Sequence, residues 1–163
     1  MATKITQKIT PFLWFDNQAE EAVNFYTSIF ENSSIGKTSR YSGEGAKASG
    51  QKEGTVMTMA FNLNGQNFTA INGGPIFKFT EAISFVVSCE DQAEVDHYWN
   101  KLTEGGQEVQ CGWLKDKYGL SWQVVPGQMG ELMSGANAGK VMGAMLKMKK
   151  IIIKDLEDAA NQS

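Results

Sequence analysis

An internal repeat is the feature that most constrains the fold of this 163-residue chain. Asp16–Glu20 (DNQAE) aligns with Glu90–Glu94 (EDQAE) at an offset of 74 residues, and the same offset pairs Ile9 with Ile83. A repeat of this length indicates two similar supersecondary units, each too small to close a core alone. We therefore read the chain as a tandem of two related halves.

Both copies of the repeat predict a strand followed by a helix. Phe12–Phe15 and Ile83–Val87 are short apolar runs of strand length. Asn17 and Asp91 each stand three residues before a Glu, which is the spacing of an N-cap residue and its capping partner. Apolar residues then recur at helical spacing: Ala19, Ala22, Val23, Tyr26, Ile29 and Phe30 in the first copy, and Val95, Tyr98, Trp99 and Leu102 in the second.

Further strands follow each helix. Thr55–Leu63 alternates between apolar and polar residues and turns at Asn64-Gly65 into Asn67–Ile71. In the second copy we expect strands over Val109–Leu114 and Ser121–Val125. The first copy is longer by about 20 residues. We assign this excess to Arg40–Gly54, whose Gly, Ser, Lys and Glu content predicts a flexible flap.

These elements predict an α+β fold of two tandem β-α-β-β-β units, which form curved mixed sheets around a cavity and end in a C-terminal helical tail. We expect one domain over residues 1–163, with unit one at about residues 8–74, unit two at about 77–126 and the tail at 127–163. In the tail, Val141, Ala144, Met145 and Met148 fall at helical spacing, and Lys154–Ala160 predicts another short helix.

Composition excludes several classes of function. The chain has 15 Lys and Arg against 18 Asp and Glu, a net charge of −3, and no basic stripe, so no nucleic-acid partner is expected. No apolar run approaches the roughly 20 residues that cross a bilayer, and Met1–Thr10 lacks the apolar centre of a signal peptide. We therefore expect a cytoplasmic protein with no membrane partner, whose Cys89 and Cys111 are reduced thiols.

Five segments resemble one known family. The tandem plan is that of the vicinal oxygen chelate superfamily, which includes glyoxalase I, the bleomycin resistance proteins and the extradiol dioxygenases. Within it the chain resembles the PhnB-like family, whose members carry the label 3-demethylubiquinone-9 3-methyltransferase. The segments that carry the resemblance are Phe12–Asp16, Asn72–Pro75, Lys78–Phe85, Cys111–Gly119 and Ser121–Pro126. The resemblance implies a glyoxalase/bleomycin-resistance-like domain and a homodimer.

The resemblance also implies positions for a divalent metal ion. The ligands of the superfamily, commonly His and Glu, project here onto Ile9 or Thr10, Ile83 or Ser84, Thr69, and Gln123. Neutral amide and hydroxyl oxygens bind first-row divalent ions too weakly to replace imidazole and carboxylate. Because His97 is the one histidine, a site with two imidazoles from one chain is also excluded. We expect no metal and no cofactor.

The methyltransferase label does not fit the glycine pattern. S-adenosylmethionine is normally held by a Gly-rich turn that follows a parallel strand and opens a helix. Gly73-Gly74 precedes Pro75, and Gly105-Gly106 follows a predicted helix, so neither pair has this context. Methyltransferase activity is therefore not expected.

A small-molecule cavity needs aromatic walls and a few polar anchors. The candidate ligand-binding residues are Trp14, Thr69, Asn72, Lys78, Cys111, Trp113 and Gln123. Each has a structural alternative: Gln123 as a hydrogen-bonded buried amide, Cys111 as a small apolar residue, Asn72 and Lys78 as solvated linker residues, and the tryptophans as core. For His97 we expect a structural or surface role, and no catalytic residue is assigned.

Three functions remain open at this point, and the sequence does not decide whether the protein is an enzyme. The first is a cytosolic, metal-free protein that binds a small organic molecule, as the superfamily's resistance proteins do. The second is a divalent-metal-dependent lyase, dioxygenase or isomerase that uses a different constellation, for example Glu81 and Asp116. The third is an enzyme without metal that uses Cys111 as a nucleophile or Lys78 as an acid.

Overall fold

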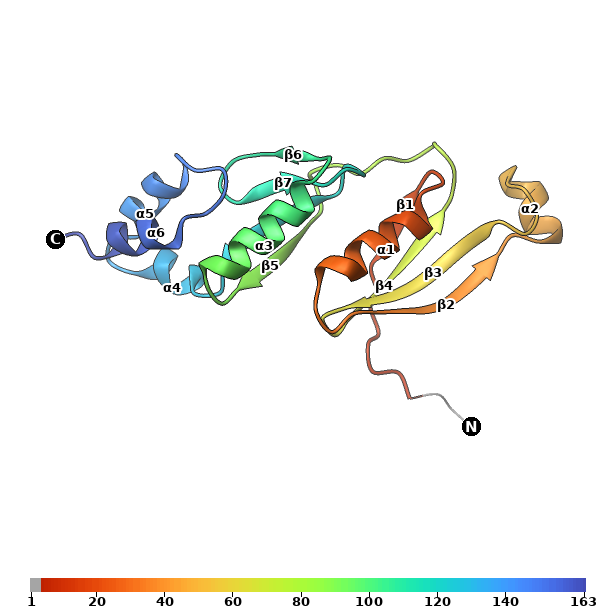
Figure 1. The fold of residues 1–163 in the computed structure, drawn as a ribbon, viewed down its shortest axis with the longest axis horizontal. Coiled ribbons are helices and arrows are strands. Elements are labelled where there is room, and N and C mark those ends of the chain that lie inside the picture. Colours follow the sequence, from red (N-terminus) through yellow and green to blue (C-terminus); the bar gives the residue numbers. More distant parts are fainter. Residues whose placement is uncertain (1–3) are drawn as a thin grey trace. The chain divides into compact units, whose positions relative to one another are not determined.

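A computed structural model describes residues 4–163, which form two compact units, one ending at Lys78 and one running from Phe79 to Ser163 (Figure 1). Each unit contains one four-stranded mixed sheet with a helix packed on it, and the second unit continues into a helical C-terminal region. The expected α+β class and tandem organisation are confirmed.

The first unit is built around three stacked aromatic rings. Its elements are β1 (Phe12–Phe15), α1 (Ala19–Ile29), β2 (Ser34–Arg40), α2 (Gly43–Ser49), β3 (Val56–Leu63) and β4 (Gln66–Asn72). The strand order is β1-β4-β3-β2, with β1 parallel to β4 and the other pairs antiparallel. Tyr26 of α1 stacks on Phe61 at 6.3 Å between ring centroids, and Phe61 stacks on Phe68 at 5.2 Å. These contacts fix which face of the sheet α1 covers.

The second unit repeats this topology. Its sheet consists of β5 (Ser84–Cys89), β6 (Gln107–Glu108), β7 (Trp113–Lys115) and β8 (Ser121–Pro126), in the order β5-β8-β7-β6. The strand β5 runs parallel to β8, as β1 does to β4. The helix α3 (Gln92–Thr103) buries Val95, Tyr98, Trp99 and Leu102. The predicted repeat therefore corresponds to a repeated strand order.

The start of α1 differs from the sequence prediction. Asn17 is exposed, and the N-cap is Gln18, whose side chain makes no capping hydrogen bond. Instead, the first helical amide, Ala19 N, donates to Asn72 Oδ1 at 2.8 Å. The predicted cap is correct for α3, where Asp91 Oδ1 accepts from Glu94 N at 2.9 Å. A side chain from the end of β4 thus takes over the role that the local sequence gave to Asn17.

The inserted segment of the first unit is more regular than predicted. The sequence predicts a flexible flap over Arg40–Gly54, and the structure has the short helix α2 there. Ala46 is buried, and Gly50 ends the helix in the left-handed conformation at φ 71°. Tyr41, which is also buried, anchors the segment by donating from its hydroxyl to Asn72 O at 2.6 Å.

The predicted strand Val109–Leu114 is also interrupted. A turn over residues 109–112 joins β6 to β7, and Cys111 and Gly112 both have positive φ, at 60° and 82°. Their backbone amides donate to Met148 O and Lys149 O at 2.9 and 2.8 Å. A side chain on Gly112 would lie 2.9 Å from Val124 O, so only glycine fits there. Cys111 consequently lies in a turn rather than on a strand.

The C-terminal region contains the two helices that the sequence predicted and a third. They are α4 (Met129–Ser134), α5 (Ala138–Met145) and α6 (Ile153–Ala160). Val141, Ile151 and Leu156 are fully buried and hold the region to the second unit. Over residues 4–163, no helix has the length and apolarity that crossing a bilayer requires.

A substitution of Asn72 tests whether its side chain caps α1. We expect Asn72→Ala to lower the free energy of unfolding by about 2–4 kcal/mol, because it removes the cap of α1 and leaves Val56 O, which accepts from Asn72 Nδ2 at 3.1 Å, without its donor. Asn17→Ala is the matched control and should change it by less than about 0.5 kcal/mol. Urea titration followed by circular dichroism measures both, and equal losses would contradict the assignment of the cap to Asn72.

Candidate functional site

The second sheet has one face against α3 and one face opposite it, which we call the distal face. Successive strand residues alternate between the two, so Leu114 and Trp122 are buried on the α3 side. The distal face is formed by Ser84, Val86, Ser88, Gln107, Trp113, Lys115, Ser121, Gln123 and Val125. In the ladder, Gln123 lies opposite Trp113 and Val86, and Ser121 lies opposite Lys115 and Ser84.

Gln123 and Ser84 are joined on this face. Gln123 Nε2 donates to Ser84 Oγ at 2.9 Å across the parallel β5–β8 pair. These are two of the positions at which the superfamily resemblance places metal ligands. Both side chains are uncharged, and they are hydrogen-bonded to one another. The bond leaves the Gln123 carbonyl oxygen as an acceptor and the Ser84 hydroxyl hydrogen as a donor.

Ser121 is a residue of this face that the sequence analysis missed. Its side chain is 1% exposed, and its hydroxyl has no hydrogen-bond partner within the described part of the chain. Leaving a buried hydroxyl unpaired costs about 1–3 kcal/mol. The sequence held one weak signal for it, because Ser84 and Ser121 are small polar residues that each open an apolar strand. The ladder register then places the two side by side.

Asp116 and Glu81, considered as alternative metal ligands, have other roles. The Asp116 carboxylate is buried and accepts hydrogen bonds from Tyr118 N at 2.9 Å, Leu120 N at 3.1 Å and Trp122 Nε1 at 2.9 Å. Glu81 forms an ion pair with Lys115, and the hydrogen bond from that ammonium holds the pKa of Glu81 below its usual value. Both carboxylates are therefore committed to contacts within the second unit.

The donor chemistry does not fit a divalent ion. Within residues 4–163, no three His, Cys, Asp or Glu side chains come close enough together to hold a metal. The projected positions carry an aliphatic side chain, hydroxyls and an amide, and one hydroxyl–amide pair is already hydrogen-bonded. Such neutral oxygens are weak ligands for first-row ions.

The candidates of the first unit lie in different environments. Trp14 and Thr69 are half-buried on the sheet face opposite α1. Trp14 donates from Nε1 to Gly74 O at 2.9 Å, and its ring lies edge-on to Phe77 at 4.8 Å. Asn72 points to the α1 side, where both ends of its amide bind backbone groups.

The remaining candidates are not gathered at one site. Lys78 is exposed at the end of the first unit, and Cys111 is half-buried in the turn before β7. His97 is exposed on α3, as expected, and its ring meets Tyr98 edge-on at 4.9 Å. Within the second unit, the structure therefore brings together Trp113 and Gln123 from the predicted set.

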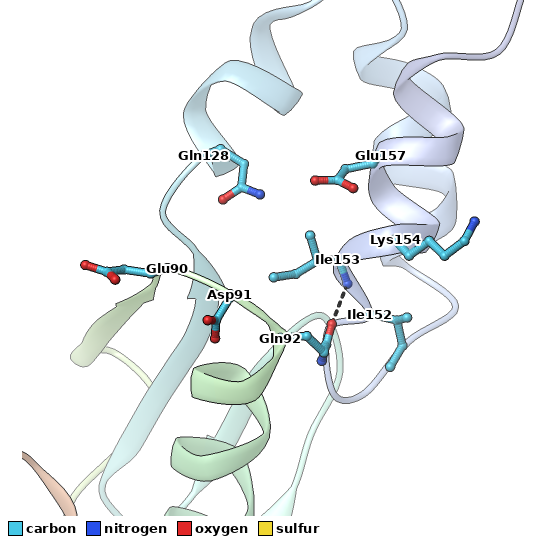
Figure 2. Close-up of a pocket in the computed structure, with 8 residues that line it drawn as sticks. All are labelled: Glu90, Asp91, Gln92, Gln128, Ile152, Ile153, Lys154 and Glu157. Carbon is cyan, nitrogen blue, oxygen red and sulfur yellow. Dashed lines mark hydrogen bonds between the residues drawn. The ribbon is translucent and has the colours of Figure 1, made fainter.

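A hollow of about 380 Å³ lies elsewhere in the second unit, between the start of α3 and the start of α6 (Figure 2). It is lined by Glu90, Asp91, Gln92, Gln128, Ile152, Ile153, Lys154 and Glu157. Gln128 and Glu157 face one another across it, and Gln92 Oε1 accepts from Ile153 N at 2.8 Å (Figure 2). Lys154 is ion-paired with Asp158 at 2.6 Å. The sequence analysis did not predict this hollow, because its walls come from three separate segments.

In the comparison with known proteins, a family model and a solved structure carry the same family description. A family model described as 3-demethylubiquinone-9 3-methyltransferase matches residues 7–125. A Bacillus cereus PhnB protein with the same description is 44% identical, with a TM-score of 0.65 over 73% of this chain and 99% of that one. The comparison with curated proteins finds no match.

More distant structures share the fold alone. Protein PA1353 from Pseudomonas aeruginosa is 19% identical, with a TM-score of 0.60 over 74% of this chain and 98% of that one. The Listeria monocytogenes fosfomycin resistance protein FosX, whose structure holds Mn(II) and sulfate, is 15% identical, with a TM-score of 0.53 over 80% of this chain and 97% of that one.

The two free cysteines should differ sharply in reactivity. Cys89 is 1% exposed, and burial, with smaller contributions from Glu94 and Asp91, raises the pKa of its thiol to about 12. At about pH 8 its thiolate fraction is then on the order of 10⁻⁴, so iodoacetamide should not modify it in the folded protein. We expect one adduct, on Cys111, by intact mass, and two after unfolding. Cys111→Ser should give none when folded, and an adduct on Cys89 would contradict the burial described here.

Proposed function

The chain belongs to the 3-demethylubiquinone-9 3-methyltransferase family, the PhnB-like family, and from this premise we propose that it binds a small organic molecule without a metal ion. The proposed site is the distal face of the second sheet. The observation that carries the proposal is the hydrogen bond between Gln123 and Ser84, which pairs two uncharged side chains at positions where the superfamily resemblance places metal ligands.

Binding at such a site depends on shape and on a few directed polar contacts. Trp113 provides an aromatic surface directly opposite Gln123 in the ladder. The Gln123 carbonyl oxygen and the Ser84 hydroxyl hydrogen provide an acceptor and a donor. Trp14 and Thr69, on the corresponding face of the first sheet, are proposed as ligand-contact candidates of the first unit by itself. Lys78, Asn72 and Cys111 receive no role in this site.

We do not propose that this chain transfers methyl groups, although the family's name describes a methyltransferase. Gly73 lies under the Trp14 ring, where an added side chain would come within 2.2 Å of ring atoms, and Gly73 N donates to Phe15 O at 2.9 Å. Gly105 and Gly106 follow α3 rather than precede a helix. Neither Gly73-Gly74 nor Gly105-Gly106 therefore offers backbone amides at a helix N-terminus to a cofactor.

A metal-dependent enzyme is the less favoured function. It would need the carboxylates of Asp116 and Glu81, and these are held by three hydrogen-bond donors and by Lys115 respectively. Removing Asp116 from its donors would leave two backbone amides and an indole N–H without their acceptor.

We also propose that the protein acts in the cytoplasm as a homodimer, without nucleic-acid or membrane partners. The acidic balance of the chain supports the exclusion of nucleic acid. Met142 and Leu146 of the C-terminal region are exposed at 38% and 61%, which is compatible with packing between subunits. Light scattering of the purified protein tests the dimer.

Metal addition tests the first part of the proposal. Protein purified without chelator should carry no stoichiometric metal by elemental analysis, and about 1 mM Mn²⁺ or Zn²⁺ should leave its melting temperature unchanged within about 1 °C. A micromolar metal site would instead raise the melting temperature by about 8 to 16 °C at that concentration. Such a rise, or a stoichiometric ion, would overturn the metal-free function.

Ligand screening tests the second part. We expect aromatic and quinone-like metabolites to include compounds that raise the melting temperature of the wild-type protein. Gln123→Ala should remove this rise, because it deletes the acceptor and the partner of Ser84. Asn100→Ala, which removes an exposed amide of α3 away from the distal face, is the control and should retain it. The proposal fails when no compound in a broad screen binds.

A further inference from the structure

We propose that Ser84, Ser121 and Gln123 form a subsite for an uncharged group that both donates and accepts hydrogen bonds, such as an amide or a phenol, carried on an aromatic ring. The inference rests on the proposed function and specifies the chemical class of its ligand. Four observations support it: an unpaired buried hydroxyl, the pattern of donors and acceptors, the charge, and the neighbouring aromatic surface.

The unpaired hydroxyl is the first observation. Ser121 is 1% exposed, and its Oγ lacks a partner among the described residues. It lies on the distal face, because it is two residues before Gln123 on β8 and opposite Ser84 on β5. Buried hydroxyls are normally paired with a protein group or with ordered water, so an unpaired one marks a position where a water molecule or a ligand group can bind.

The pattern of donors and acceptors is the second observation. Because Gln123 Nε2 already donates one hydrogen to Ser84 Oγ, the Gln123 side chain has its carbonyl oxygen left to accept and a second N–H left to donate. The Ser84 hydroxyl still has its hydrogen to donate, and the Ser121 hydroxyl can do either. A ligand that satisfies all three must combine a donor with an acceptor. An amide or a phenolic hydroxyl does so, and a purely apolar ring does not.

The charge of the site is the third observation. Lys115, the nearest cation in the ladder, is neutralised by Glu81. The lowered pKa of Glu81 is consistent with that pairing. A carboxylate ligand would therefore lose its hydration without gaining an unpaired cation, and burying an ion in this way is costly. The site thus favours a neutral ligand.

The aromatic surface is the fourth observation. Trp113 lies directly opposite Gln123 in the antiparallel β7–β8 pair, on the same face. Side chains paired in this way have Cβ atoms about 4.5–5.5 Å apart. A ring that stacks on the Trp113 indole can therefore place a polar substituent beside Gln123 and Ser121.

The Lys115–Glu81 ion pair lies beside Ser121 in the ladder, and we infer that it covers the subsite. Lys115 lies on one side of Ser121, and Glu81 precedes Ser84, which lies on the other side, so the ion pair spans the start of β8. The side chain of Glu81 is 60% exposed, so the pair can open to solvent. Ligand access to Ser121 requires this opening.

Titrations followed by ¹H–¹⁵N NMR of the full chain test the subsite. The probes are benzamide, its charged counterpart benzoate and its apolar counterpart toluene. We expect benzamide to shift the signals of Ser84, Trp113, Ser121 and Gln123 with a dissociation constant of about 1 mM, as befits a ligand of this size. Benzoate and toluene should bind the same residues at least about fivefold more weakly.

Two serine variants separate the subsite from the rest of the face. Ser121→Ala should weaken benzamide binding about three- to tenfold, and it should melt no lower than the wild type because the hydroxyl it removes is unpaired. Ser88→Ala, an exposed serine of β5, should bind benzamide unchanged. Unchanged binding by Ser121→Ala, or benzoate binding as tight as benzamide, would overturn the inference.

The location of the shifts separates this inference from the proposed function. Saturable benzamide shifts around Trp14 and Thr69 instead would support small-molecule binding and overturn the subsite. The absence of saturable shifts with every probe up to about 10 mM would also overturn the subsite, while the broader metabolite screen would still decide the proposed function.

A variant of Glu81 tests whether the Lys115–Glu81 ion pair covers the subsite. Glu81→Gln weakens the ion pair with Lys115 and should tighten benzamide binding about two- to fivefold. Asp158→Asn, which removes the partner of Lys154 in another exposed ion pair of the same unit, is the control and should have no effect. Equal affinities of Glu81→Gln and the wild type would show that the ion pair does not cover the subsite.

Discussion

The buried carboxylate of Asp116 is the interaction on which the geometry of the second unit depends. Its oxygens accept from Tyr118 N, Leu120 N and Trp122 Nε1, while Asp116 N donates to Leu120 O at 2.9 Å. These bonds fix the turn between β7 and β8. This turn sets the register of the two strands, which places Ser121 opposite Lys115 and Gln123 opposite Trp113. A one-residue slip would move all four side chains to the other face, so the distal face depends on a residue that does not point into it.

In the first unit, the side-chain amide of Asn72 has the corresponding role of fixing the arrangement of the elements. Asn72 joins the start of α1, the start of β3 and the Tyr41 anchor through its side chain and its own carbonyl oxygen. It ends β4, whereas Asp116 follows β7, so the two units stabilise one topology through non-equivalent positions. Polar groups with full hydrogen bonding in a core specify one arrangement strongly, since any alternative leaves them unpaired.

Sequence reasoning succeeded where apolar periodicity carries the signal. The repeat, α1, α3, β8 and the tail helices follow from residues that must be buried, such as Tyr26, Trp99 and Leu156. It assigned no residue range to β2, where six of seven residues are exposed. It was wrong at the turn around Cys111, whose positive φ depends on hydrogen bonds to residues about 37 positions away. Ser121 could not be found because an unpaired hydroxyl is a property of its neighbours and not of its own sequence context.

The attachment of the C-terminal region has a consequence for how this chain can evolve. The turn before β7 binds the region through the backbone carbonyls of Met148 and Lys149, and main-chain groups are indifferent to which side chains those positions carry. Gln92 is different, because its amide donates to Ile151 O at 3.0 Å and accepts from Ile153 N at 2.8 Å, and few side chains can do both. Residue 149 can therefore be substituted without loss of these bonds, whereas Met148 also accepts from Ile152 N through its sulfur at 3.5 Å, and position 92 is constrained to keep an amide.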